Sequence, residues 1–154
     1  MKKVKHFLAI ALLVNASFAW GEIAQAEEKI AIVVNRSPTC SCCGKWVEHL
    51  KQNNFNVKDV VSDDVQAIKN KYGITKELAS CHTAIVNGYA IEGHVPADDI
   101  KTLLKKKSDV VGITVPGMPS GTPGMEMGGR KEAYQVISFD KKNQQQVFNS
   151  YQAE

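Results

Sequence analysis

The chain has 154 residues, 44% of them hydrophobic and 23% charged, and its net charge at pH 7 is +3. This small charge excludes the strongly basic surface on which nucleic-acid binding depends, so we expect no nucleic-acid partner. The length is sufficient for one compact domain with a hydrophobic core of its own.

The segment Met1–Ala26 has the three parts of a secretory signal peptide. Three lysines within the first five residues precede an apolar run from Phe7 to Trp20, and Ala24 and Ala26 supply small side chains at the cleavage positions. An uncleaved anchor is the alternative, but the run is shorter than the roughly 20 apolar residues that span a bilayer. We therefore predict cleavage after Ala26, export to the periplasm without stable membrane insertion, and one domain over residues 27–154.

Strand and helix patterns alternate after this leader. The continuous β-branched run from Ile30 to Val34 predicts a strand buried on both faces. Apolar residues at helical spacing then predict a helix from about Cys42 to Asn53. A second strand is expected over Val57–Val61, and the cysteines therefore lie where the first strand passes into the first helix.

A second helix and a hairpin follow. The helix is expected over Val65–Tyr72, with Ser62 or Asp63 as its N-cap and Gly73 at its end. Asn87-Gly88 is the strongest short hairpin signal, because a type I′ turn needs positive φ at both central residues. The predicted hairpin strands cover Thr83–Val86 and Tyr89–Ile91.

The last part of the chain combines a third helix with a long loop and two strands. The helix is expected over Ala97–Lys107, and a Gly/Pro-rich stretch runs from Gly112 to Gly129. Strands are expected over Tyr134–Phe139 and Gln146–Tyr151. The whole order is typical of a thioredoxin-like α/β domain, in which helices flank a mixed sheet. The Gly/Pro/Met-rich loop and the β-hairpin would be a C-terminal extension of it.

The four cysteines do not have the spacing of two structural disulfides. Cys40, Cys42 and Cys43 lie within four positions and only Cys81 is distant, whereas a stabilising disulfide joins distant parts of a chain. Cys40 and Cys43 form a C-x-x-C at a helix N-terminus, where the positive end of the helix dipole lowers the pKa of a thiol. Because a thiolate is both a nucleophile and a metal ligand, the pattern indicates either disulfide exchange or metal binding.

Cys42 favours metal binding over disulfide exchange. A dithiol enzyme needs only an attacking and a resolving cysteine, so Cys42 has no task in one. Successive helical residues project about 100° apart, so we expect the side chains of Cys42 and Cys43 to diverge. Two or more ions bridged by shared thiolates, or two thiolates with an outside ligand, would fit such a spread better than one ion held by three thiolates.

Cys81 and His82 come directly before the first strand of the predicted hairpin. In thioredoxin-like folds this place, beside the C-x-x-C, normally holds a cis-proline, and counting back from the hairpin puts His82 there. A thiolate and an imidazole would then face the cysteine cluster. We therefore expect four soft or borderline ligands to converge, or five with His82.

Methionines and other histidines add candidate ligands. Thiolates and thioethers select Cu(I), and Met118, Met125 and Met127 all lie on the Gly/Pro-rich loop. Filling gaps in the core is nevertheless the ordinary role of any single methionine. His94 is a candidate ligand too, with a helix-start contact or simple exposure as the alternative. His49 lies about 10 Å along the helix from the cysteines, so we do not expect it to bind the same ion.

The cysteine spacing does not match the usual zinc or iron–sulfur patterns. A structural zinc site usually joins two separated ligand pairs, which one C-x-C-C and one distant cysteine do not supply. The spacing also differs from the ferredoxin patterns of iron–sulfur proteins. Geometry alone thus stops at a soft metal or a redox pair, and the prediction of copper, bound as one or more Cu(I) ions, rests on the softness of the ligands and on the family resemblance described next.

Four motifs resemble those of one known family, in the same order along the chain. They are Ser37–Trp46, Glu77–Ala84, Glu92–Ala97 and Val115–Lys131. Through them the chain resembles the CopG family of periplasmic copper-resistance proteins. The resemblance implies a thioredoxin-like fold, a copper site built on Cys40, Cys42, Cys43 and Cys81, and a role beside periplasmic copper exporters and copper oxidases.

Two functions follow from these observations. In the favoured one, the protein binds Cu(I) in copper resistance and is not an enzyme. In the other, it is a thiol-disulfide or copper oxidoreductase that acts through Cys40 and Cys43. The two can coexist, because a thiolate cluster can also pass electrons. A third hypothesis, a zinc-stabilised domain, predicts that chelation unfolds the protein.

Overall fold

A computed structural model of the protein describes residues 28–126 and 128–154. The predicted signal peptide and Met127 therefore lie outside the described residues. No helix in the described part is long and apolar enough to cross a membrane. The elements, in chain order, are β1 (Ile30–Arg36), α1 (Ser41–Gln52), β2 (Phe55–Val61), α2 (Val65–Lys71), β3 (His82–Val86), β4 (Tyr89–Glu92), α3 (Ala97–Lys106), β5 (Gly112–Thr114), β6 (Tyr134–Phe139) and β7 (Gln145–Tyr151).

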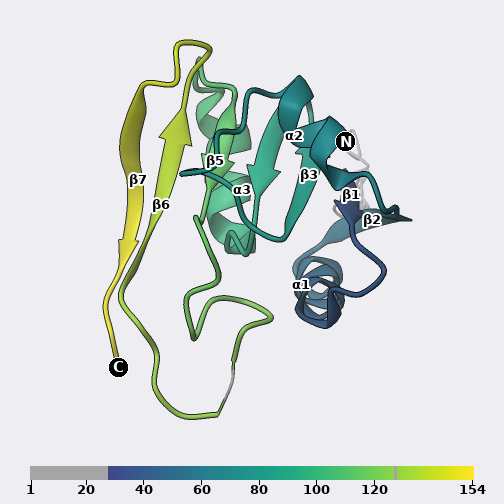
Figure 1. Cartoon of the computed structure of the whole chain (residues 1–154). Helices are drawn as coiled ribbons and strands as arrows, with labels where there is room; N and C mark the ends of the chain where they lie inside the picture. Colours follow the sequence, from purple (N-terminus) through teal and green to yellow (C-terminus); the bar gives the residue numbers. More distant parts are fainter. Residues whose placement is uncertain (1–27, 127) are drawn as a thin grey trace, which may run out of the picture.

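The strands form one mixed sheet in the order β2-β1-β3-β4-β5-β6-β7 (Figure 1). β1 pairs with β2 in parallel, as β4 does with β5, and the other neighbours are antiparallel. The first four strands and the three helices have the order and directions of a thioredoxin-like domain, which confirms the predicted fold class. Strands β5, β6 and β7 extend that sheet on the β4 side.

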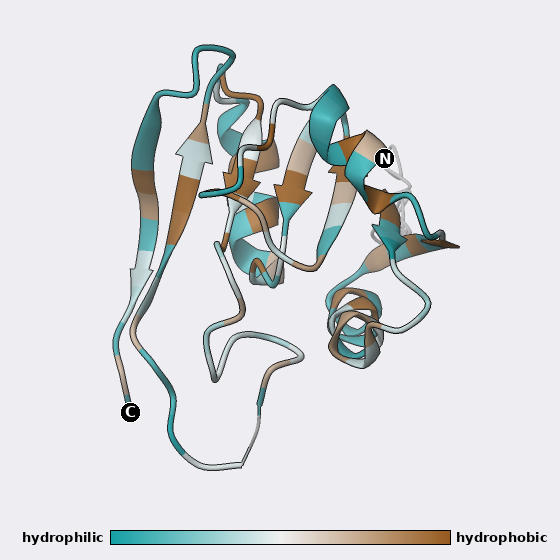
Figure 2. Ribbon diagram, viewed as in Figure 1, coloured by the Kyte–Doolittle hydropathy of each residue, from teal (hydrophilic) through white to brown (hydrophobic). Residues whose placement is uncertain are grey.

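Two apolar clusters lie on opposite faces of the sheet. Because successive side chains of a strand point to opposite faces, the alternation along β3 separates them. Ala84 and Val86 belong to the larger cluster, which includes apolar residues of α1 and α3. Ile85 packs against the smaller cluster, which includes apolar residues of the segment that follows α2 in the chain. Figure 2 shows the apolar colouring concentrated on the central strands and on the inner sides of the helices. The sheet is therefore covered by α1 and α3 on one face and by α2 and the segment after it on the other.

The first strand differs from its predicted burial. Ile32 and Val34, which point to one face of the strand, are buried. Ala31, which points to the other face, is exposed. The prediction that β1 is buried on both faces is therefore wrong. The reason is that α1 covers one face of β1, whereas little of the short helix α2 reaches the other.

Two smaller predictions about element ends are also wrong. The N-cap of α2 is Asp64 instead of Ser62 or Asp63, and its side chain accepts a hydrogen bond from the Ala67 N–H at 3.1 Å. The loop expected from Gly112 begins with β5, which pairs with β4. A Cβ atom on Gly112 would lie 1.9 Å from the Ala90 carbonyl oxygen, so glycine is what lets the two backbones approach here.

Candidate metal centre

The C-x-C-C segment forms the start of α1. Cys40 is the N-cap residue and has an extended backbone, with φ −85° and ψ 92°, while Cys42 and Cys43 lie in the first turn of the helix. Cys40 and Cys43 form a disulfide in this structure, and Cys42 and Cys81 are free thiols. Cys43 is fully buried, and the other three cysteines are partly accessible. The turn therefore offers sulfur atoms at the edge of the core.

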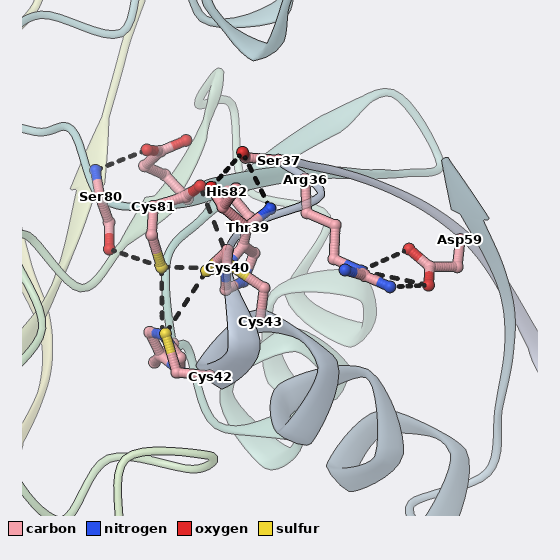
Figure 3. Close-up of a disulfide and its surroundings, with 12 residues drawn as sticks. Arg36, Ser37, Thr39, Cys40, Cys42, Cys43, Asp59, Ser80, Cys81 and His82 are labelled. Atoms are coloured by element: carbon pink, nitrogen blue, oxygen red, sulfur yellow. Dashed lines mark hydrogen bonds and ion pairs between the residues drawn. A yellow bond between two sulfur atoms is a disulfide. The ribbon is translucent and has the colours of Figure 1, made fainter. Parts of the chain in front are cut away.

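All four sulfur atoms lie within 4.8 Å of one another. The Cys40 and Cys42 Sγ atoms are 3.4 Å apart, and Figure 3 shows Cys81 facing this turn from the far side of the site. The expected divergence of the Cys42 and Cys43 side chains therefore does not keep their sulfur atoms apart. Cys40 precedes the helix, so the rotation of about 100° per helical residue does not fix its direction, and its sulfur lies beside that of Cys42. The structure brings together the four cysteines that the sequence singled out.

Cys81 lies in the segment between α2 and β3 and contacts both nearby histidines. Its Sγ is 3.3 Å from Nδ1 of His82 and 3.1 Å from Nε2 of His94. These three ligand atoms also lie within 4.8 Å of one another. Burial raises the pKa of the Cys81 thiol to about 11, so without a metal this cysteine is a neutral thiol with one proton to share between two imidazoles.

His94 has a defined tautomer. Its Nδ1 is 2.8 Å from the Pro123 carbonyl oxygen, and a carbonyl can only accept, so Nδ1 carries the proton. Nε2 is then an unprotonated acceptor that faces Cys81. A backbone carbonyl that orients the far nitrogen is typical of metal-binding histidines.

His82 is completely buried, and its Nε2 has no hydrogen-bond partner among the residues that the structure describes. The ring stacks against Trp46 with centroids 4.3 Å apart and meets the His94 ring edge-on at 5.0 Å. Burial, chiefly, lowers the pKa of His82 well below its usual value, and it also lowers that of His94. Both imidazoles are therefore neutral at pH 7, which is the form that binds metals.

The Gly/Pro-rich loop crosses the start of α1. A Cβ atom on Gly124 would lie 2.8 Å from the Trp46 backbone nitrogen and 3.1 Å from the Cys42 carbonyl oxygen. The glycine thus allows the loop to lie directly against the cysteine turn. Met125, the next residue, is partly buried, and the Met118 side chain is 53% exposed. Met127 lies outside the described residues.

His49 has a structural contact away from the cysteines. Its Nε2 accepts a hydrogen bond from the Ala97 N–H at 3.1 Å, at the first residue of α3. This contact joins α1 to α3. It agrees with the expectation that His49 does not share an ion with the cysteines.

A buried charge network that was not predicted from the sequence lies behind Cys81. The fully buried Glu92, the last residue of β4, accepts hydrogen bonds from Lys69, from the Thr83 hydroxyl at 2.6 Å and from the Ser80 N–H at 2.6 Å. Burial raises the pKa of Glu92 while its three donors act in the opposite direction. Among these donors, the Lys69 amino group is the cation that favours the ionised form of this carboxylate. An acidic residue inside an apolar hairpin strand was the only sequence signal of this network.

Together these side chains form a compact set of soft and borderline donors. Four sulfurs and two neutral imidazole nitrogens converge, and the buried, unpartnered nitrogen of His82 shows that the polar groups here are not fully satisfied within the protein. Such donors suit soft or borderline transition metals rather than Mg²⁺ or Ca²⁺. In this structure two of the sulfurs, those of Cys40 and Cys43, are bonded to each other as a disulfide.

Fold and site define a thioredoxin-like protein with additional cysteine and histidine side chains around its C-x-x-C. A family model described as a protein of unknown function, DUF411, matches residues 78–125. Two solved structures, described as copper resistance protein CopG in Form 1 and in Form 2, are 46% and 45% identical in sequence to this chain. Each aligns with a TM-score of 0.77 over 99% of its own chain and over 81% or 80% of this one. No curated protein matches the sequence. The chain therefore belongs to the CopG family.

Proposed function

We propose that this protein binds Cu(I) through Cys40, Cys42, Cys43 and Cys81 and serves in copper resistance. The observation that carries the proposal is the convergence of these four sulfur atoms within 4.8 Å. Thiolates are the protein ligands that select Cu(I). The related solved structures, described as copper resistance proteins, support the same metal.

The number of sulfurs favours more than one copper ion. Thiolates can bridge neighbouring ions, and Cys40, Cys42 and Cys81 come from two separate segments that face each other. His82 and His94 would complete the ligand set on the Cys81 side, since both direct a ring nitrogen at its sulfur. Met118, Met125 and Met127 remain candidate thioether ligands from the loop that covers the turn.

Reduction has to precede binding by all four sulfurs. The Cys40–Cys43 disulfide takes up two electrons and two protons from a dithiol reductant, which is itself oxidised to a disulfide, and two thiols result. Copper then displaces the thiol protons, because a coordinated thiol is deprotonated. Binding should therefore be tight only in the reduced protein and should release protons.

A second function is favoured by the disulfide itself. If Cys40 and Cys43 act as a redox pair, their two thiols can reduce two Cu(II) ions to two Cu(I) ions, with formation of the disulfide and release of two protons. Alternatively they can exchange with a disulfide of a partner protein. In both cases the protein is an oxidoreductase, and Cys42 isn't needed for the electron transfer.

The place of action is part of the proposal. A cleaved signal peptide, Met1–Ala26, would deliver a single domain of residues 27–154 to the periplasm. There it would exchange copper with exporters or copper oxidases. The predicted cleavage can be checked by N-terminal sequencing of the protein recovered from a periplasmic extract.

Anaerobic titration of the reduced protein with Cu(I) against a competing chelator tests the main proposal. We expect at least one copper per chain, and loss of copper in Cys42→Ser and Cys81→Ser. Ser41→Ala is the matched control, since it changes the same turn without removing a sulfur. Less than one copper per chain would rule out the copper-binding function.

A Cys42→Ser variant that keeps disulfide-exchange or Cu(II)-reducing turnover, but loses stable copper, would establish the second function. Zinc bound in preference to copper, with unfolding on chelation, would favour a zinc-stabilised domain instead.

A further inference from the structure

We propose that Glu92 is the positioning residue of the candidate metal centre, because it fixes the Ser80–Cys81 turn that presents the Cys81 thiol to the other cysteines. This inference rests on the proposed copper function and adds a residue that makes no contact with the metal ligands' donor atoms. The Glu92 side chain is completely buried, with 0% of it exposed. A buried carboxylate is retained only where its surroundings satisfy it.

Both oxygens of Glu92 accept hydrogen bonds. One accepts from Lys69 and from the Ser80 N–H, and the other accepts from the Thr83 hydroxyl. The Lys69 amino group also donates to Thr83 Oγ1 at 3.1 Å. The ion pair and the hydroxyl therefore hold the carboxylate in one orientation, and the remaining contact, to Ser80, is the one that reaches the site.

The Ser80–Cys81 segment needs such a contact. It lies between α2 and β3, outside regular structure, and directly precedes His82, the position at which a proline is expected in thioredoxin-like proteins. Here the Ser80 backbone is tied to Glu92, and the Ser80 hydroxyl donates to the Gly117 carbonyl. In Figure 3, Ser80 and Cys81 lie side by side, with the cysteine sulfur directed at the C-x-C-C turn.

The neighbours of Glu92 in sequence act on the same segment. Gly93 has a φ of +73°, and a Cβ atom there would lie 2.5 Å from Ser80 Cβ, so only glycine leaves room for Ser80. His94, one residue further, directs Nε2 at the Cys81 sulfur. Three consecutive residues therefore act on the Ser80–Cys81 segment. Glu92 binds the Ser80 backbone, Gly93 leaves room for the Ser80 side chain, and His94 contacts the Cys81 sulfur.

The network lies behind the site. Thr83 and Glu92 are paired across β3 and β4 and face α2, whereas His82, the preceding residue of β3, faces Trp46 on α1. Glu92 therefore acts on Cys81 through the backbone of Ser80. A supporting residue of this kind typically changes metal affinity by about 10-fold to 100-fold when it is removed.

The test compares Glu92→Leu with Asp99→Leu. Asp99 is the matched control because its carboxylate is also buried, yet it accepts hydrogen bonds from Asn149 and Tyr151, far along the sheet from the cysteines. We expect Glu92→Leu to weaken Cu(I) binding about tenfold or more, with little change in Asp99→Leu. Glu92→Gln, which keeps an oxygen for the Ser80 N–H, should restore most of the affinity.

A second measurement does not depend on copper. In the reduced, metal-free protein, the rate at which a small alkylating reagent modifies Cys81 should rise in Glu92→Leu relative to the rate at Cys42, as followed by peptide mass spectrometry. If the wild-type protein binds no Cu(I), the copper function fails, and the alkylation ratio alone still decides the positioning role. Equal ratios in Glu92→Leu and Asp99→Leu would overturn it. Should Glu92→Leu not fold, Thr83→Val replaces it, with a smaller shift in the same direction expected, and no shift would overturn the proposal.

Discussion

The cysteine end and the C-terminal hairpin bury polar groups in different ways. Behind the cysteines, a lysine and a glutamate form an ion pair inside the protein, and a histidine nitrogen is left without a partner. At the hairpin, Asp99 of α3 accepts from the neutral side chains of Asn149 and Tyr151, and most of β7 is exposed. Burying the charged and unpaired groups of the first arrangement costs free energy, and their contacts fix the orientation of the side chains, as a binding site requires. The second is an ordinary attachment of an added hairpin to the domain.

The largest expected effect on the free energy of unfolding is at Lys69, and it tests whether the buried ion pair behind the cysteines differs from an ordinary surface pair. Lys69→Met leaves the Glu92 carboxylate buried without its cation, and removal of one partner of a buried pair costs about 3 to 5 kcal/mol of unfolding free energy. Urea unfolding of the reduced protein measures this loss. Lys51→Met is the matched control, because the Lys51–Glu48 pair is on the surface and contributes about 0.5 kcal/mol or less. A Lys69→Met/Glu92→Gln double variant, which removes both charges, should recover much of the loss. Equal stability of the two lysine variants would show that the buried pair has no special role.

The fold was largely predictable because its signals are local. Apolar periodicity located the helices, and Asn87-Gly88 located the hairpin, where both residues have the positive φ that the turn needs. The strand β5 was missed because three residues carry no periodicity, and its place depends on the close approach of Gly112 to Ala90.

The residues that meet at the candidate site could be predicted from the sequence, whereas the contacts that support them could not. Clustered cysteines and a distant Cys81-His82 are unusual in sequence, so they were found. The contacts of Lys69, Ser80 and Glu92 join three segments of the chain, and no local pattern indicates such a meeting. The disulfide between Cys40 and Cys43 was likewise open, since the C-x-x-C spacing suits exchange and metal binding equally well.

A smaller effect, in acid, would sharpen the contrast between the two ends. Burial lowers the pKa of His82 in the folded protein below the value of 6.5 that it has when exposed. Protonation therefore favours the unfolded chain, so the contribution of His82 to stability is present above about pH 6.5 and is lost as the pH falls through the folded pKa. His82→Leu should flatten the decline of unfolding free energy below that pH, as measured by urea unfolding of the metal-free protein. His49→Leu is a partial control, since the pKa of the half-buried His49 is lowered too but its ring lies away from the cysteines. An unchanged acid slope in His82→Leu would contradict this assignment.

The smallest effect is expected at the hairpin, in Tyr151→Phe. This change removes the hydroxyl that donates to Asp99 at 2.7 Å and keeps the ring that stacks on Tyr134 with centroids 4.6 Å apart. A hydrogen bond to a charged group contributes about 1.5 to 3 kcal/mol when buried, and because Tyr151 is only partly buried we expect about 1 kcal/mol here. Tyr134→Phe keeps the same stacked pair without touching Asp99, so it should cost less.

Urea unfolding gives both values, and a Cu(I) titration of the same variants asks whether the hairpin influences the cysteines. Since the two regions use separate carboxylates, neither variant should change copper affinity. A weaker affinity in Tyr151→Phe would mean that α3 transmits the hairpin's attachment to the Cys81 side of the site.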